Sequence, residues 1–240
     1  NHLISLLNKG KKMKKYLFCS LFILSSSIIL ADGHMDARKN ADMKKYENNF
    51  AYLSTYTIPA GSNPATLSKS LLKNVEQLKK DGYNNCGLLR HAFGGDRAFY
   101  SYCYFDTWEQ FAKINDNAAG SDVRQLYGDH DDRLVSVDKK NLGPSKYLVM
   151  ATYSFGPYLT IGERAERAQI IFDIYDEGFG GCNMMSHVWG PGLEWQIVCG
   201  FDSYAEFAQI NKKLQPLTAV LVNQKLDILS HSDDIMIRVN

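Results

Sequence analysis

The stretch that decides the fold is FDTWEQFAKIN at residues 105–115, because FDSYAEFAQIN follows at residues 201–211, which is 96 positions later. Six of the eleven residues are identical in the two stretches. The same offset extends outward without a gap through rarer residue types: Gly82 and Gly178, Cys86 and Cys182, His91 and His187, Gly94 and Gly190, and Cys103 and Cys199. Self-similarity at a fixed spacing indicates that one structural unit is present twice.

The first copy has the pattern strand, helix, strand, strand, helix, strand. Residues 50–58 are β-branched and aromatic, which is typical of a strand. Asn63, which precedes a proline, predicts the start of a helix, and Gly82 predicts its end. The Gly94-Gly95 dipeptide predicts a tight turn between the next two strands, and residues 133–137 form the closing strand.

The second copy repeats this pattern. Residues 147–155 form its first strand, and Thr160 with Glu163 has the spacing of a capping box at the start of a helix. That helix is expected to end at Gly178, and residues 235–239 form the closing strand.

Two features complete the element assignment. Asp106 and Asp202 are expected to cap the second helix of their copies, since Asp is a preferred N-cap residue. Residues 138–145 contain a Gly-Pro dipeptide and are expected to link the two copies.

The βαββαβ order of each copy is that of the ferredoxin-like split unit. Two such units in one chain, over about residues 48–240, resemble the dimeric α/β-barrel superfamily. The resemblance implies an α+β fold: a tandem duplication of a ferredoxin-like βαββαβ unit, with two sheets packed face to face as an intramolecular pseudo-dimer. The superfamily includes small cofactor-free monooxygenases, haem-degrading proteins and chlorite-dismutase relatives. No catalytic residue of these proteins is carried over to a position in this chain.

Residues 1–31 are predicted to be a leader and signal peptide. Met13 precedes two lysines, residues 16–30 are largely apolar, and Ala31 offers a cleavage point. A membrane anchor is the alternative, but the apolar stretch is shorter than the ~20 residues of a span. We therefore expect an exported protein, periplasmic or secreted, without a stable membrane span after cleavage. Residues 32–47 would be a flexible mature N-terminus, 48–138 repeat 1 and 146–240 repeat 2.

The charge balance argues against nucleic-acid partners. The full chain has 27 basic and 26 acidic residues, and the first 31 residues contain five lysines and no acid. The mature part would then have 22 basic and 26 acidic residues, a net charge of −4. A mildly acidic protein without a basic run has no electrostatic surface for nucleic acid or anionic lipid.

The four cysteines of the repeats are predicted to form two disulfides. With a two-residue turn at Gly94-Gly95, residues whose numbers sum to 189 face each other, as Cys86 and Cys103 do. A turn at Gly190-Pro191 pairs Cys182 with Cys199 in the same way. Both pairs fall at non-hydrogen-bonded positions, where side chains are closest. Four buried free thiols are the alternative.

A metal site is not expected. Cys86 with His91, and Cys182 with His187, have the spacing Cys-x4-His. Residues five apart on a strand point to opposite faces of the sheet, so each pair cannot share a metal ion. No cofactor is identified from the sequence.

The candidate site residues lie on the face of the histidines. The hairpin register places His187 opposite Glu194, and a carboxylate beside an imidazole suits acid–base chemistry, so these two are the candidate catalytic residues. The candidate ligand-pocket residues are His91, Tyr100, Tyr102, Trp189 and Gln196. The alternative is that the aromatic residues are core, and that the paired histidines, including His130 and His231, are structural.

Two function classes remain open. The sequence has no nucleophile motif, phosphate loop or dinucleotide fingerprint, which favours an exported binding or structural protein with a small apolar ligand. The alternative is a small cofactor-free monooxygenase-like or haem-handling enzyme that uses a pocket of histidine and aromatic residues. Fold alone does not decide between them, because one fold serves many functions.

Overall fold

A computed structural model describes residues 46–95, 97–116, 126–221 and 224–239. The expected leader, and most of the expected flexible N-terminus, lie outside the described residues. The elements follow in the order β1 (Phe50–Thr57), α2 (Pro64–Asp81), β2 (Cys86–Phe93), β3 (Ala98–Phe105), α3 (Trp108–Asn115), β4 (His130–Lys140), β5 (Tyr147–Phe155), α4 (Ile161–Phe179), β6 (Cys182–Trp189), β7 (Trp195–Phe201), α5 (Tyr204–Leu221) and β8 (Ile228–Arg238).

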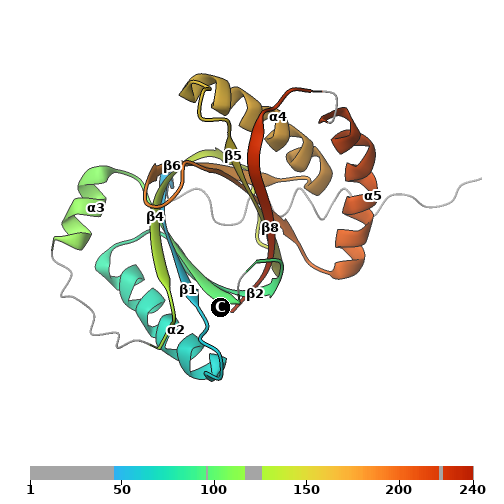
Figure 1. The fold of residues 1–240 in the computed structure, drawn as a ribbon. Coiled ribbons are helices and arrows are strands. Elements are labelled where there is room, and N and C mark those ends of the chain that lie inside the picture. The colour runs from blue at the N-terminus through green and yellow to red at the C-terminus, as the bar shows by residue number, and fades with distance from the viewer. Residues whose placement is uncertain (1–45, 96, 117–125, 222–223, 240) are drawn as a thin grey trace, which may run out of the picture.

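The eight strands form one closed antiparallel barrel in the order β1-β3-β2-β8-β5-β7-β6-β4 (Figure 1). The predicted fold class, a tandem ferredoxin-like duplicate with two sheets packed face to face, is therefore wrong. The reason lies at the strand edges: β2 pairs with β8 and β4 pairs with β6. These two pairings form hydrogen bonds with the backbone N–H and C=O groups that the edge strands of two separate sheets would leave unpaired. The division into 48–138 and 146–240 stays a prediction.

The helices pack outside the barrel. Helices α2 and α3 lie on one side of it, and α4 and α5 lie on the opposite side (Figure 1). Strand residues alternate between the two faces, so one set of side chains packs under the helices and the other points inward. Phe99 and Phe105 belong to the first outer core, Ile197 and Phe201 belong to the second, and Leu148 and Met236 belong to the inner cluster.

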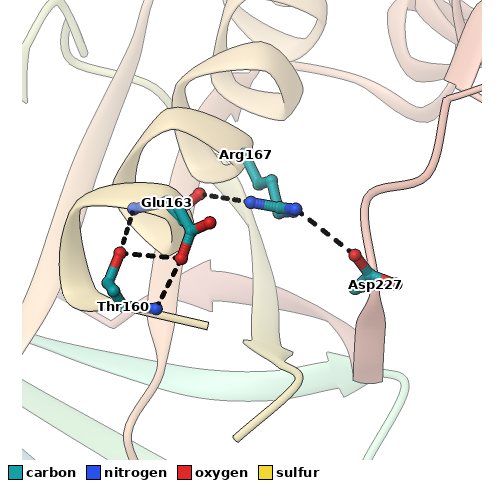
Figure 2. Close-up of polar contacts among 4 residues, drawn as sticks. All are labelled: Thr160, Glu163, Arg167 and Asp227. Atoms are coloured by element: carbon teal, nitrogen blue, oxygen red, sulfur yellow. Dashed lines mark hydrogen bonds and ion pairs between the residues drawn. The ribbon is translucent and has the colours of Figure 1, made fainter. Parts of the chain in front are cut away.

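The helix starts follow the sequence. Asn63 caps α2 and accepts a hydrogen bond from the Ala65 amide. Thr160 and Glu163 form the predicted capping box of α4 (Figure 2). One turn later, Arg167 donates to the carbonyl of Glu163 and reaches the Asp227 carboxylate at 3.3 Å (Figure 2). This contact attaches the start of α4 to the segment that enters β8.

The expected caps of the second helices are displaced by one residue. Thr107, not Asp106, caps α3, and the Ser203 hydroxyl accepts from the Glu206 amide at the start of α5. The two aspartates instead bind the backbone of the segments that enter β1 and β5. Asp106 accepts from the backbone of Asn48, and Asp202 accepts from the backbone of Lys146.

The hairpin register and both predicted disulfides are confirmed. Cys86 faces Cys103 and Cys182 faces Cys199 in the strand pairing. The pairs are bonded, with Cα–Cα distances of 4.1 Å and 4.3 Å. All four cysteines are buried in the outer cores under the helices. None of the described helices is long and apolar enough to cross a membrane.

The barrel has two distinct ends. Four antiparallel steps separate β2 from β6, so both strands run in the same direction. The turns that follow them, at Gly94 and Gly190, therefore lie at the same end, which we call the hairpin end. Strand β4 is antiparallel to β6, so the segment 141–146 that leaves β4 lies at the opposite end, which we call the linker end.

Candidate functional site: a cavity inside the barrel

The inside of the barrel holds a cavity of about 1000 Å3. Its walls come from all eight strands, and residues 141–145 of the linker add to the wall at the linker end. A volume of this size is at the upper end of the ~300–1,000 Å3 that small-molecule pockets occupy. We call this cavity the lumen.

The middle of the lumen is an apolar belt. Aliphatic and methionine side chains of both halves form most of it, namely Leu53, Leu89, Leu148, Met150, Val198 and Met236. Tyr100, Tyr102 and Tyr104 follow one another along the inward face of β3 and add aromatic surface. Such a belt buries the apolar part of a bound molecule by the hydrophobic effect.

The linker end of the lumen carries positive charge. Arg238, at the end of β8, donates through Nη1 to the Tyr102 hydroxyl and through Nε to the Ser145 carbonyl, both at 2.6 Å. Lys140, at the end of β4, donates to the Glu47 carbonyl and the Asn49 side chain at 2.7 Å. Both cations thus have neutral oxygens as their partners within the described residues.

Tyr104 and Asn183 lie beside this positive end. The Asn183 amide nitrogen approaches the Tyr104 hydroxyl at 3.5 Å, and its oxygen accepts from the backbone of Leu142 at 3.0 Å. Leu142 packs against the inner cluster, so the linker is fixed against the lumen. Desolvation inside the barrel raises the pKa of Tyr104 to about 12, and the neighbouring Tyr102 adds to the rise. Tyr104 is therefore a neutral phenol at physiological pH.

The hairpin end carries negative charge. Arg133 of β4 donates through Nη1 to the Glu194 carboxylate at 2.5 Å, so these two charges neutralise each other. Asp131 and Asp234 line the same end, and Asp234 accepts a hydrogen bond from the Gly95 amide at 2.6 Å. The lumen therefore runs from a positive end to a negative end.

Gln196 is the most conspicuous polar group of the wall. Its side chain is only 4% exposed, it lines the lumen, and its amide oxygen has no hydrogen-bond partner among the described residues. A buried polar atom without a partner costs about 1–3 kcal/mol. An amide oxygen is an acceptor, so Gln196 could accept a hydrogen bond from a donor on a molecule in the lumen.

The structure brings some of the predicted site residues together and not others. Tyr100, Tyr102, Glu194 and Gln196 all line the lumen. Among the described residues, His91, His187 and Trp189 are not part of its wall, and the Trp189 side chain is 70% exposed near the hairpin turn. The His187 amide donates to the Glu194 carbonyl at 3.1 Å, as the register predicts, while the Glu194 carboxylate pairs with Arg133. The roles of His187 and Glu194 stay predictions.

Three functional candidates were missed in the sequence. Arg133, Asn183 and Arg238 line the lumen, but each is a single polar residue on a strand. Alternation along the strand could have placed Arg133 on the face of Val135 and Val137, and Arg238 on the face of Met236. It could not have shown whether that face points inward or toward a helix.

His130 and His231 were expected just before the closing strands, but they lie within β4 and β8 and are not part of the lumen wall among the described residues. His130 stacks on Tyr56 at 4.6 Å and lies 3.1 Å from the Asp132 carboxylate. His231 stacks on Tyr153 at 4.3 Å and lies 3.1 Å from Asp233. Both ring pairs pack on the outer face of the barrel, since Tyr56 and Tyr153 belong to the outer cores. This arrangement supports the structural interpretation of these two histidines.

Metal and haem ligation were tested against the same wall. Within the described part of the chain, no group of three or more His, Cys, Asp or Glu side chains could hold a metal ion. Haem iron is commonly held by a histidine or a cysteine thiolate. Neither described histidine of the hairpins lines the lumen, and Cys86 is bonded to Cys103. The lumen residues therefore do not fit a haem held by histidine or cysteine.

No protein-family model and no curated protein matches the sequence. Among solved structures, a proposed monooxygenase from Fusobacterium nucleatum matches with a TM-score of 0.57 at 11% identity, over 80% of this chain and 92% of that chain. An anthrone oxidase-like protein matches with a TM-score of 0.54 at 10% identity, over 81% and 92%. A proposed chlorite dismutase matches with a TM-score of 0.50 at 15% identity, over 80% and 95%. At these identities the comparison shows that the chain shares a fold with the three proteins.

Proposed function

We propose that the protein binds a small amphipathic organic molecule inside its barrel. The observation that carries this proposal is the lumen itself: about 1000 Å3, apolar in the middle and polar at both ends. A wall of this composition is the usual form of a small-molecule site, where a few polar groups fix the orientation of the ligand.

The amide oxygen of Gln196 adds a second observation. Buried polar atoms are nearly always hydrogen-bonded, and Oε1 of this lumen-lining residue has no partner among the described residues, so it is a candidate acceptor for a molecule in the lumen. An ordered water or a ligand can supply that partner. The apolar belt beside Gln196 favours a ligand with an extended apolar part.

Binding is tested by filling the lumen. Met150 is half-buried and lines the lumen, so Met150→Trp places an indole in the ligand space. The probe is N-phenyl-1-naphthylamine, a neutral dye that fluoresces in apolar surroundings. We expect Met150→Trp to raise the dissociation constant of the dye by about tenfold or more, a loss of about 1.4 kcal/mol.

The matched control is Ile161→Trp, which adds the same ring at a position that is 64% exposed at the start of α4. It should leave dye binding as in the unmodified protein. Leu53→Trp is the second lumen variant, should Met150→Trp not fold as judged by circular dichroism. Equal dye binding by the unmodified protein and a folded lumen variant would show that the dye does not occupy the barrel.

A second candidate function is cofactor-free oxidation of the bound molecule by dioxygen. The structural neighbours described as a proposed monooxygenase and an anthrone oxidase-like protein support it, since they share the fold. Three tyrosines on the lumen wall could contact an aromatic substrate. Of the two acid–base residues predicted from the sequence, Glu194 lines the lumen and is the candidate that could reach a molecule bound there, whereas His187 lies opposite it across the hairpin and outside the described wall.

Anthrone is the substrate to test, because its oxidation needs no other reactant: anthrone and dioxygen give anthraquinone and water. An oxygen electrode should show uptake that depends on the protein, with anthraquinone formed in equal amount. The Glu194→Gln variant should lose this activity while circular dichroism shows that it remains folded. Uptake no faster than in buffer would remove this candidate and leave the binding proposal untouched.

The export of the protein is part of the same proposal. Two disulfides in the described structure are typical of proteins from oxidising compartments. A binding protein in such a compartment would meet its ligand outside the cytoplasm.

A further inference from the structure

The two ends of the lumen differ in charge, and this difference limits the charge of the molecule that can bind there. The acidic residues of the lumen wall, Asp131, Glu194 and Asp234, are all at the hairpin end. Arg133 neutralises one of them. At the linker end the wall carries Arg238, Lys140 and Lys79, and of these Lys79 is paired with Glu76 at 2.8 Å.

The Arg238 guanidinium has N–H groups that form no hydrogen bond among the described residues. A guanidinium group has five N–H donors. Two of the nitrogens are engaged, Nη1 with the Tyr102 hydroxyl and Nε with the Ser145 carbonyl, which leaves three N–H groups without a partner among the described residues. No carboxylate of the described residues forms an ion pair with Arg238. A half-buried charge without a counter-ion is unfavourable, and an anion in the lumen would relieve this cost.

The contacts of Arg238 also hold it in place. The Ser145 carbonyl belongs to the linker and the Tyr102 hydroxyl belongs to β3, so the guanidinium is held from two sides. Its planar set of donors matches the two oxygens of a carboxylate, or two of the three oxygens of a sulfonate. The linker residues 141–145 form part of the wall there.

We propose that the ligand of the lumen is an amphipathic organic acid, whose acidic group binds Arg238 at the linker end and whose apolar rings fill the belt. This inference rests on the proposed function, that the lumen binds a small molecule. The carboxylates of the hairpin end repel an anion, so the ligand has one favoured orientation. Gln196, on the wall of β7, supplies a hydrogen bond to a polar substituent of the rings.

A pair of dyes tests the charge directly. 1-Anilinonaphthalene-8-sulfonate has the ring system of N-phenyl-1-naphthylamine and adds one sulfonate. In Arg238→Met we expect the dissociation constant of the sulfonate to rise about tenfold and that of the neutral dye to change less than about twofold, since a hydrogen bond to a charged group is lost only in the first case. Arg238→Lys, which keeps the charge, should restore most of the affinity for the sulfonate.

The control for loss of a positive charge is Lys212→Met, at an exposed position of α5, which should change neither constant. Should Arg238→Met fail to fold, the unmodified protein gives a second test: 2-naphthoate should displace the sulfonate dye at least about fivefold better than 2-naphthamide. Equal loss of both dyes in a folded Arg238→Met, or equal displacement by acid and amide, would overturn the inference. Failure of the neutral dye to bind the unmodified protein would instead refute the proposed function.

Discussion

The Arg238 side chain donates a hydrogen bond of 2.6 Å to the Tyr102 hydroxyl, although 136 positions separate the two residues in the chain. The bond runs inside the barrel from the end of β8 to β3, and β2 lies between these strands in the barrel order. It therefore joins the two halves of the chain where β2 and β8 close the barrel. The same two side chains form part of the lumen wall, so this contact serves stability and the site together.

Removal of the Tyr102 hydroxyl should weaken the closed barrel. We expect Tyr102→Phe to lower the free energy of unfolding by about 1.5 kcal/mol, because a hydrogen bond to a charged group is lost without a change in ring packing. Urea unfolding followed by circular dichroism measures this. The control is Tyr204→Phe, at a half-exposed ring on α5. An equal and small effect of both changes would contradict a role of this bond in closing the barrel.

Each disulfide should stabilise its hairpin independently. The bonded cysteines are 17 positions apart in both pairs, and closing a loop of this length in the unfolded chain stabilises the fold by about 3 kcal/mol. Replacing Cys86 and Cys103 together by Ala, and then Cys182 and Cys199, should give similar losses in urea unfolding. Without reductant, alkylation should label none of these four cysteines. Labelling of any of them in the folded protein would refute the pairing.

Because of its buried tyrosines, the protein is expected to lose stability at alkaline pH. Burial raises the pKa of Tyr104 and Tyr175 to about 12, and it also raises the pKa of Tyr52, Tyr56, Tyr83 and Tyr153. In the unfolded chain tyrosine ionises near pH 10. Between pH 10 and about 12 the unfolded state thus binds fewer protons than the folded state, so stability falls as pH rises.

The test is a titration followed by tyrosine absorbance and circular dichroism together. The buried tyrosines should ionise only as the barrel unfolds, above the pH near 10 at which tyrosine ionises in an unfolded chain. Full ionisation of all tyrosines near pH 10 in a folded protein would contradict their burial.

The proposed export predicts where the chain would begin after removal of the leader. The leader pattern before Asp32 predicts that the secreted protein begins at or near this residue. N-terminal sequencing of the protein from a secreting host checks it. A product that keeps Met13 and stays in the membrane would show that the apolar segment is an anchor.

Local patterns in the sequence predicted the elements and the disulfides well. The pairing of the cysteines could be predicted from a two-residue turn and the alternation of hydrogen-bonded and non-hydrogen-bonded strand positions. Both are local properties of a hairpin. The capping box of Thr160 and Glu163 is likewise local and was found where expected. The caps of α3 and α5 were assigned one residue too early, because Asp and the following Thr or Ser are all good N-cap residues.

The closure of the barrel and the make-up of the site could not be predicted. Closure depends on the pairing of β2 with β8 and of β4 with β6, and no local pattern specifies which edges meet. The contact of Arg133 with Glu194 depends on this pairing, because β4 reaches the β6–β7 hairpin only in the closed barrel. Sequence reasoning paired Glu194 with His187 instead, since it considered one hairpin alone.

A crystal structure of the protein with N-phenyl-1-naphthylamine bound would show whether the ligand site is the inside of the barrel. We expect the dye within the lumen, with its rings in contact with Leu53 and Met150 and its amine near Gln196. A dye found between the barrel and the helices, or on the exposed surface around Trp189, would contradict it.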